Sequence, residues 1–389
     1  MRKNMLLAVL CTVAAVLAGC RGAQQRTAAA ADRDSIAVDD SAARIAPQYA
    51  EGFSVEYADD GLRLVTVSDP QKGEKSKTYR FALVPRGQKY GQLPEGYTPI
   101  EVPIRRSIAM TTLQLSNFIA LGALDFVSGI TSTRHLQNRD IKARIKDGRI
   151  SQIGMEGNFD AEVIMAAAPD VIFISPFKRG GYEAIKETGI TLVPHLGYKE
   201  MTPLGQAEWV KFIAMFIGRE REANAFFDAV AARYAEVKAL AASVAQRPTV
   251  FSGEMHGGNW FAVGGRNHLA QLFRDAGADY VLSDNEETGG IPMDFERLYA
   301  IAANADFWRI LNSYPGDFSY EALRASEPRN ADFKAFRERK VIYCNMKQTP
   351  YYEQSPVHPE QLLEDLVFAF HPELLPKDFE PTFYRLLEK

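Results

Sequence analysis

The residues best suited to ligand chemistry gather in one short loop, Gly253–Phe261. The side chains in it that we single out are Glu254, Met255, His256 and Trp260. Methionine and histidine can occupy the axial positions of a haem iron, and an indole offers a flat apolar face. A lone histidine in a loop also serves as a simple hydrogen-bonding residue. The pattern therefore predicts a ligand-binding loop and leaves direct metal ligation open.

Further candidates for ligand contact follow the strands that the apolar runs predict. They are Thr111, Thr112, Arg134, His135, Phe177, Lys178, Arg179, Tyr198, Asn345 and Tyr351. Arginine pairs with carboxylates through two parallel hydrogen bonds, and cations also stack on aromatic rings. As a set, these residues predict a broad aromatic and basic cleft for a large, flat or anionic metal complex. The sequence predicts no separate cofactor, and its six histidines show no HxH or HExxH spacing, which disfavours a zinc or manganese site.

The elements that must position these residues alternate between strands and helices from about residue 101. Such alternation is typical of a mostly parallel sheet covered on both faces, in which ligands bind beyond the carboxyl ends of the strands. Over 204–246 the apolar period becomes 3.6 residues, which predicts one long helix with Gly218 as its one weak point. The expected fold is α/β, with two Rossmann-like lobes (101–203 and 247–389) joined by this single long helix.

Two segments, Asp160–Ala166 and Asp294–Ala300, echo one another. Each begins with an aspartate at the expected N-cap and carries a glutamate, Glu162 or Glu296, in the first turn of a helix. Both glutamates are also what the helix dipole alone would favour. The echo indicates two lobes of similar build, with the ligand between them.

The N-terminus predicts export and lipid anchoring. Residues 1–19 combine Arg2 and Lys3, a short apolar stretch and small residues before Cys20, which predicts a bacterial lipoprotein signal peptide and lipidation of Cys20. An ordinary secretory signal is the alternative. Residues 20–48 predict a flexible tether, and 49–100 predict a small N-terminal β extension without a core of its own. The expected location is periplasmic, lipid-anchored to the cell membrane.

Composition restricts the partners. The formal net charge is −4 over 389 residues, which gives no reason to expect nucleic acid. If Cys20 is lipidated and the signal is removed, Cys344 stands alone, so no intramolecular disulfide is expected.

Several motifs occur in an order and spacing that carry a family resemblance. They are Gly122–Ile130, Ile153–Glu162, Ala168–Ile172, Asp275–Asp279 and Phe370–Leu374. Together they resemble the periplasmic binding proteins for iron complexes and vitamin B12, over about Arg105 to Lys389. The resemblance implies a monomeric, non-enzymatic substrate-binding lipoprotein that captures an iron–siderophore complex or haem and delivers it to the permease of an ABC importer. Cobalamin is the alternative ligand. In that family two lobe-surface glutamates dock onto arginine pockets of the permease, and Glu162 and Glu296 match them.

Rival functions stay open at this point. A tetrapyrrole chelatase shares the two-lobed plan and would use His256 and Glu254 as proton acceptors. The sequence has no G-x-S-x-G elbow, P-loop or Rossmann G-x-G-x-x-G motif after a strand. A lipoprotein that hands over a ligand without a permease is a third possibility.

Overall fold

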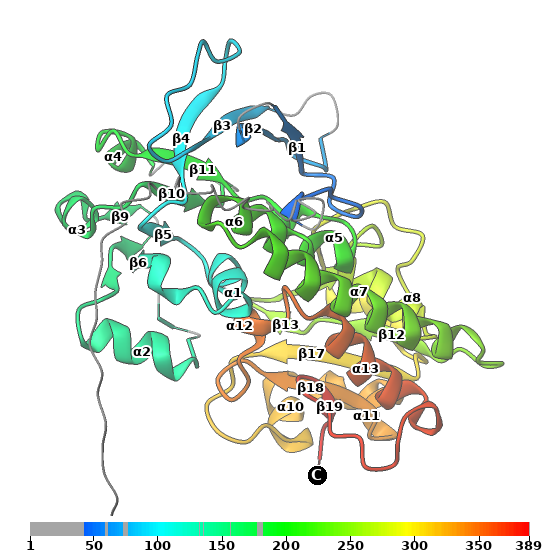
Figure 1. The fold of residues 1–389 in the computed structure, drawn as a ribbon. Helices are drawn as coiled ribbons and strands as arrows, with labels where there is room; N and C mark the ends of the chain where they lie inside the picture. The colour runs from blue at the N-terminus through cyan, green and yellow to red at the C-terminus, as the bar shows by residue number, and fades with distance from the viewer. Residues whose placement is uncertain are drawn as a thin grey trace, which may run out of the picture. The chain divides into compact units, whose positions relative to one another are not determined.

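The computed structural model describes residues 43–58, 61–72, 77–131, 133–134, 136–155, 157–176 and 182–388. These residues belong to one compact unit that begins at Ser41, and Figure 1 shows its arrangement. No helix in this described part of the chain is long and apolar enough to cross a membrane.

The N-terminal lobe is built on a parallel sheet with the strand order β11-β10-β5-β6-β7. The strands are β5 (Ser107–Ala109), β6 (Val127–Ile130), β7 (Ser151–Gln152), β10 (Val171–Ile174) and β11 (Thr191–Pro194). A short hairpin, β8 (Gly154–Met155) and β9 (Asn158–Phe159), follows β7. The helices are α1 (Thr112–Ala120), α2 (Arg139–Lys146), α3 (Ala161–Ala167) and α4 (Glu183–Lys186). Every residue of β10 is buried, as expected for a strand covered on both faces.

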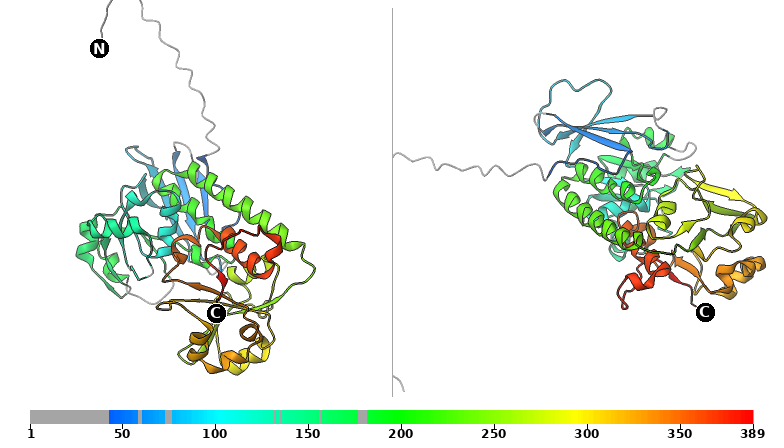
Figure 2. Two further views of the ribbon diagram at one scale, coloured as in Figure 1. Left: turned by 90° about the horizontal axis from the view of Figure 1, so that it is seen from below. Right: turned by 90° about the vertical axis from the view of Figure 1, so that its right-hand side faces the viewer.

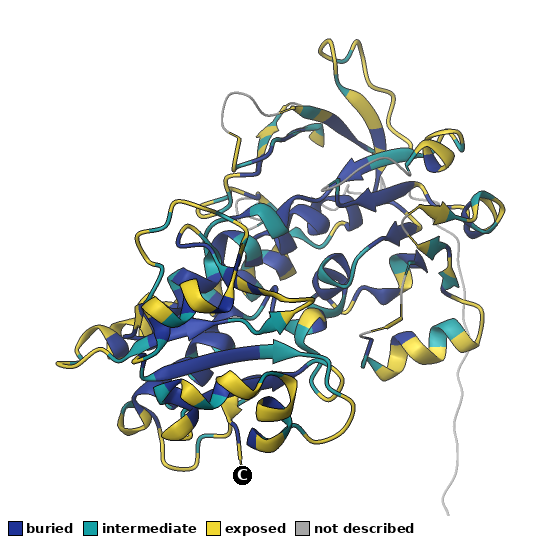
Figure 3. Ribbon diagram, turned by 180° about the vertical axis from the view of Figure 1, so that it is seen from behind, coloured by how far each residue is buried: buried dark blue, intermediate teal, exposed yellow. Residues whose placement is uncertain are grey.

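The C-terminal lobe repeats this plan with the strand order β15-β12-β17-β18-β19. The parallel strands are β12 (Thr249–Ser252), β15 (Asp279–Tyr280), β17 (Phe307–Asn312) and β18 (Val341–Asn345), and β19 (Arg385–Leu386) is antiparallel. A separate antiparallel sheet contains β13 (Met255–His256), β14 (Asn259–Val263) and β16 (Gly290–Met293). The helices are α8 (His268–Asp275), α9 (Phe295–Ala302), α10 (Tyr320–Ser326), α11 (Lys334–Arg337), α12 (Tyr351–Gln354) and α13 (Pro359–Phe370). Figure 3 shows buried strands and helices with exposed outer faces in both lobes. The α/β fold expected from the alternating pattern is confirmed.

The segment between the lobes is helical but not continuous. It consists of α5 (Pro203–Ala207), α6 (Trp209–Ile217) and α7 (Glu220–Ala242). Gly218 has φ +69° and ends α6 in the left-handed region, where glycine carries no Cβ penalty. The prediction of one uninterrupted helix over 204–246 is therefore wrong, and the long helix is α7 alone. All nine residues of α6 are buried, which makes it a central core helix.

The N-terminal β extension contains β1 (Phe53–Tyr57), β2 (Arg63–Val67), β3 (Tyr79–Pro85) and β4 (Thr98–Val102), in that order across one sheet. The parallel strand β4 was not expected from the sequence. Phe53 packs edge-on against Trp209 and Phe212 of α6, with ring centroids 5.1 and 5.4 Å apart. The buried side chains of the extension join a large hydrophobic cluster that runs through both lobes, and Figures 1 and 2 show the extension beside the N-terminal lobe.

Candidate ligand-binding site

A pocket of about 380 Å³ lies between the two lobes. Its lining residues are Thr111, Thr112, Leu113, Ser175, Tyr198 and Tyr352. The first five follow strands of the N-terminal sheet, and Tyr352 comes from α12 of the C-terminal lobe. The structure thus brings together three predicted positions, Thr111, Thr112 and Tyr198, at the strand ends where α/β sheets bind ligands. Their contact with a ligand stays a prediction.

A buried glutamine fixes the N-terminal wall of this pocket. Thr111 caps α1 by accepting from the Gln114 backbone N–H (3.3 Å), and Gln114 Oε1 accepts from the N–H groups of Met110 (2.7 Å) and Thr111 (3.2 Å). Gln114 Nε2 also donates to Ser175 Oγ (3.0 Å), which lies just after β10. The ends of β5 and β10 are therefore tied together. The Thr-x-x-Gln capping box is the sequence signal that could have identified Gln114.

Tyr198 stands on a short 3₁₀ helix, η5 (Gly197–Lys199), directly after β11. Burial raises the pKa of its phenol, so the hydroxyl stays protonated. Behind it the ring of His195 lies 4.6 Å from that of Trp209. Burial lowers the pKa of His195 to about 3, which makes this histidine neutral in the folded protein.

The C-terminal wall rests on a chain of hydroxyls and a buried cation. The ring of Tyr352 meets that of Tyr351 at 5.4 Å, and Tyr351 Oη accepts from Tyr384 Oη (3.0 Å). Tyr384 in turn accepts from Arg309 Nε (2.9 Å). Arg309 lies on β17 and is only 7% exposed, yet it forms no ion pair with a carboxylate among the described residues. Its positive charge therefore lies behind Tyr351 and Tyr352, with the Glu254 carboxyl as an electrostatic neighbour.

Helix α12 also joins the two lobes. It packs against α1, and its buried Glu353 accepts from the backbone N–H groups of Gln137 (2.6 Å) and Asn138 (3.0 Å), which precede α2. Gln137 Nε2 donates to Lys347 O (2.9 Å). Tyr352, between Tyr351 and Glu353, is therefore held in place from both lobes.

The loop Gly253–Phe261 does not line the inter-lobe pocket. Trp260 is fully buried; its ring packs against Phe251 and Trp308, and its Nε1 donates to Ser252 O (3.0 Å). The prediction that Trp260 offers a flat face to the ligand is therefore wrong. The reason is the alternation of β14, which turns Trp260 inward.

Glu254, Met255 and His256 of this loop also lie outside the inter-lobe pocket. Met255 and His256 form β13, and His256 is exposed. Glu254 accepts from Asn312 Nδ2 (3.0 Å), and burial raises the pKa of its carboxyl. None of the three lines the inter-lobe pocket, so the geometry does not favour the chelatase reading.

Other predicted residues divide into three groups. Asn345 is buried and donates to the carbonyls of Tyr314 (3.0 Å) and Gly316 (3.3 Å), so it shapes a loop, and its contact with a ligand stays a prediction. Tyr351 lies behind Tyr352, and Arg134 is exposed after β6 and outside the pocket lining. His135, Phe177, Lys178, Arg179 and Cys20 lie outside the described residues. Across the described ranges, no cluster of three or more His, Cys, Asp or Glu side chains is placed to hold a metal ion.

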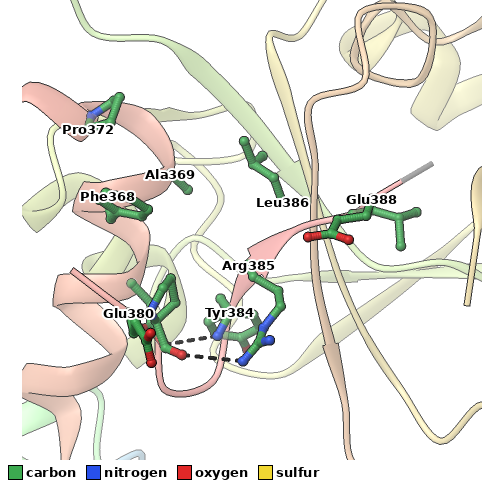
Figure 4. Close-up of a pocket in the computed structure, with 11 residues that line it drawn as sticks. Phe368, Ala369, Pro372, Glu380, Tyr384, Arg385, Leu386 and Glu388 are labelled. Carbon is green, nitrogen blue, oxygen red and sulfur yellow. Dashed lines mark hydrogen bonds between the residues drawn. The ribbon is translucent and has the colours of Figure 1, made fainter. Parts of the chain in front are cut away.

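A second pocket, of about 670 Å³, is formed by α13 and the C-terminal tail. Figure 4 shows Tyr384, Arg385 and Leu386 of the tail facing Phe368 and Ala369. The tail strand β19 pairs with Ile342 and Tyr343 near the start of β18. This pocket is therefore close to the amino end of the strand, away from the edge where ligands bind in parallel sheets.

Comparison with known proteins decides the family. Residues 108–347 match the family model described as periplasmic binding protein. The chain belongs to this periplasmic binding protein family. Two uncharacterized lipoproteins of Methanocaldococcus jannaschii are 24% and 25% identical to it, over 96% and 87% of this chain and 94% and 85% of their own lengths.

Solved structures share the fold of this periplasmic binding protein. A periplasmic heme binding protein from Pseudomonas aeruginosa superposes with a TM-score of 0.56 at 19% identity, covering 74% of this chain and 99% of that one. A protein of the ABC-type Fe3+-hydroxamate transport system from Saccharomonospora viridis gives 0.53 at 18% identity, covering 69% and 94%. At such identities the likeness shows the two-lobed fold alone.

The echoed helices of this binding protein form as expected. Asp160 Oδ1 accepts from the Val163 N–H (3.0 Å), and Asp294 Oδ1 accepts from the Arg297 N–H (2.7 Å), so each aspartate is an N-cap. Glu162 and Glu296 are both exposed in the first turns of α3 and α9. They differ in one respect, because Glu296 pairs with Arg329 (2.8 Å).

Proposed function

We propose that this periplasmic binding protein captures an anionic iron complex, either an iron–siderophore complex or haem, in the pocket between its lobes. The observation that carries the proposal is the pocket at the strand ends, with the rings of Tyr198 and Tyr352 in its walls. Arg309 adds a buried positive charge behind Tyr351. Aromatic walls suit a large flat ligand, and a buried cation favours an anionic one. The names of the heme binding and Fe3+-hydroxamate neighbours agree with this ligand class.

The ligand is tested by absorbance titration of the pure protein with haemin, a ferric hydroxamate siderophore and cyanocobalamin. Tyr352→Ala should weaken the complex by roughly tenfold, since truncating a central aromatic contact costs more than about 1 kcal/mol. Tyr90→Ala is the matched control, because Tyr90 is exposed to a similar degree (47% against 40%) but lies in the β extension. Tight binding of cyanocobalamin alone would replace the iron complex with the alternative ligand. Binding of none of the three would refute the ligand class.

Delivery to an ABC importer permease is the second half of the proposal. Glu162 and Glu296 have equivalent, exposed positions on the two lobes, which suits docking onto two arginine pockets of a permease. Reversing both charges should abolish uptake in cells while leaving the affinity for the ligand intact. Glu321→Lys is the matched control, because Glu321 is also an exposed glutamate in the first turn of a helix. Unchanged uptake in the double variant would rule out docking by these residues.

Membrane anchoring through Cys20 completes the proposal. The relatives from Methanocaldococcus jannaschii are named lipoproteins, which supports an extracytoplasmic, membrane-anchored protein. We expect it to work as a monomer on a tether that ends before Ile45, which is buried in the core. Metabolic labelling with a radioactive fatty acid should mark the wild-type protein, and Cys20→Ser should remove the label. A labelled Cys20→Ser variant would overturn the anchor assignment.

A further inference from the structure

The β extension holds the element that carries Tyr198 of the pocket. Directly after η5, Glu200 is buried and accepts from the backbone N–H groups of Glu51 (3.1 Å) and Gly52 (2.9 Å), at the start of β1. The same carboxylate accepts from Trp209 Nε1 (2.8 Å). The end of η5 is therefore fastened to the first strand of the extension and to α6.

A second contact between the extension and η5 is made by the loop after β2. Lys199, the last residue of η5, forms an ion pair with Asp69, and both side chains are largely buried (17% and 11% exposed). Gln71 Nε2 donates to Lys199 O (2.9 Å), while Asp69 Oδ1 accepts from the Gln71 N–H (3.0 Å). The loop after β2 is thus folded around Lys199, next to the pocket residue Tyr198.

Glu208 adds a third fastening between the extension and the helices behind η5. Its carboxylate accepts from the N–H groups of Gln48, Tyr49 and Ala50 at 2.7–3.0 Å. It also forms a fully buried ion pair with Lys211 (2.9 Å). Five successive backbone N–H groups, from 48 to 52, are therefore held by the two carboxylates Glu208 and Glu200.

The fit between the extension and η5 is close enough to be specific. A Cβ added at Gly52 would lie 2.8 Å from Trp209 Cζ2 and 3.0 Å from Glu200 Oε1. Gly197, the first residue of η5, is packed as tightly, since a Cβ added there would lie 2.9 Å from His195 Cε1. Side chains cannot shift at such contacts without displacing the neighbouring backbone.

The extension lies outside the common binding-protein fold. The family match begins at residue 108, after β4, and the Pseudomonas aeruginosa protein is covered over 99% of its length by 74% of this chain. The alignment with a Methanocaldococcus jannaschii lipoprotein instead covers 96% of this chain. The extension is therefore an addition to the two-lobed fold that a relative of similar length shares.

We propose that the β extension is a specificity element of the pocket, in which Asp69 and Lys199 act as positioning residues for Tyr198. The inference rests on the proposed function for the ligand that the pocket takes. Asp69 does not line the pocket; it acts through Lys199, which fixes the orientation of η5. Residues that act in this way modulate affinity by about two- to thirtyfold.

The test compares Asp69→Asn and Lys199→Met with the wild type in titrations with haemin, a ferric hydroxamate siderophore and cyanocobalamin. Each variant should bind its best ligand roughly two- to thirtyfold more weakly and change the ratio of affinities between the ligands. Asp69→Glu, which keeps the charge, should restore most of the affinity. Glu101→Gln is the matched control. Glu101 lies on the edge strand β4 and pairs with Arg86, away from η5. The affinities of this variant for the three ligands should equal those of the wild type.

Hydrogen exchange separates this inference from the proposed function. In Asp69→Asn the amides of residues 196–200 should exchange faster, with the thermal midpoint near that of Glu101→Gln. If the wild type binds a ligand and the Asp69 and Lys199 variants keep its affinities and selectivity, the inference fails while the function stands. If the wild type binds none of the three ligands, the proposed function fails, and unchanged exchange at 196–200 would then also overturn the positioning role of Asp69.

Discussion

The buried histidine behind the pocket predicts how the protein responds to acid. His195 is completely buried, and its ring contacts those of Trp209 and Phe212, with centroids 4.6 and 6.0 Å away. Burial lowers its pKa from 6.5 to about 3, since an imidazolium would lose its hydration there. The perturbation we consider is His195→Gln, which keeps a polar side chain and removes the titrating group.

The magnitude follows from linkage between protonation and folding. The folded-state pKa lies below that of the unfolded chain, so the unfolded chain binds more protons as the pH falls below 6.5, and stability is lost. Each pH unit costs about 1.4 kcal/mol, so a difference of 3.5 units (6.5 − 3) amounts to a limit of about 5 kcal/mol, which is reached below pH 3. Between pH 7 and pH 5 the loss is about 2 kcal/mol. This is a large part of the ~5–15 kcal/mol that holds a domain folded.

Urea unfolding of the wild type and His195→Gln at pH 7, 6 and 5 measures this loss. The free energy of unfolding of the wild type should fall toward pH 5 by about 2 kcal/mol more than that of His195→Gln. Phe212→Leu is the control, because it disturbs the same cluster without removing a titrating group and should lower stability equally at each pH. Parallel pH dependences for the wild type and His195→Gln would refute the reasoning, since His195 would then be protonated in the folded protein.

Three further predictions concern the lobes and the cation. Glu353→Ala should destabilise the protein by about 1–3 kcal/mol, because the partly buried N–H groups of Gln137 and Asn138 lose their acceptor; urea unfolding measures it, and an unchanged midpoint would contradict it. Gly218→Ala should cost about 1–2 kcal/mol because its φ is +69°, which thermal unfolding would show. Arg309→Met should weaken haemin binding more than cyanocobalamin binding; equal losses in titration would argue against its electrostatic role.

Local patterns were sufficient to predict most elements of the two sheets. The apolar run Val171–Ile174 became β10, and Asp160 and Asp294 became N-caps. Such signals depend only on neighbours in the sequence, through periodicity and the capping of free N–H groups. The residues after the strands of the N-terminal sheet were also predictable in this way, and Thr111 and Tyr198 lie in one pocket.

The features that could not be predicted from the sequence depend on contacts between residues far apart in the chain. Trp260 looked like a loop aromatic between Asn259 and Phe261, but its neighbours Phe251 and Trp308 make it part of a core. The parallel pairing of β4 with β3 and the ion pair between Asp69 and Lys199 likewise join segments whose proximity no local pattern reveals. Gly218 was recognised as a weak point, but a glycine in a helical pattern is compatible with a continued helix or with its end, and α6 ends there.

The C-terminal contribution to the pocket is attached to the N-terminal lobe. Tyr352 belongs to α12, which packs on α1 and is fixed by Glu353 to the residues before α2. Tyr198 is held on the same side by the β extension through Lys199 and Glu200. Both aromatic walls should therefore move with the N-terminal lobe when the lobes shift. The hydrogen bond that would change is the one between Tyr351 and Tyr384, because Tyr384 and its partner Arg309 both belong to the C-terminal lobe. Lobe motion would therefore vary the distance of the buried charge from the ligand more than the shape of the pocket.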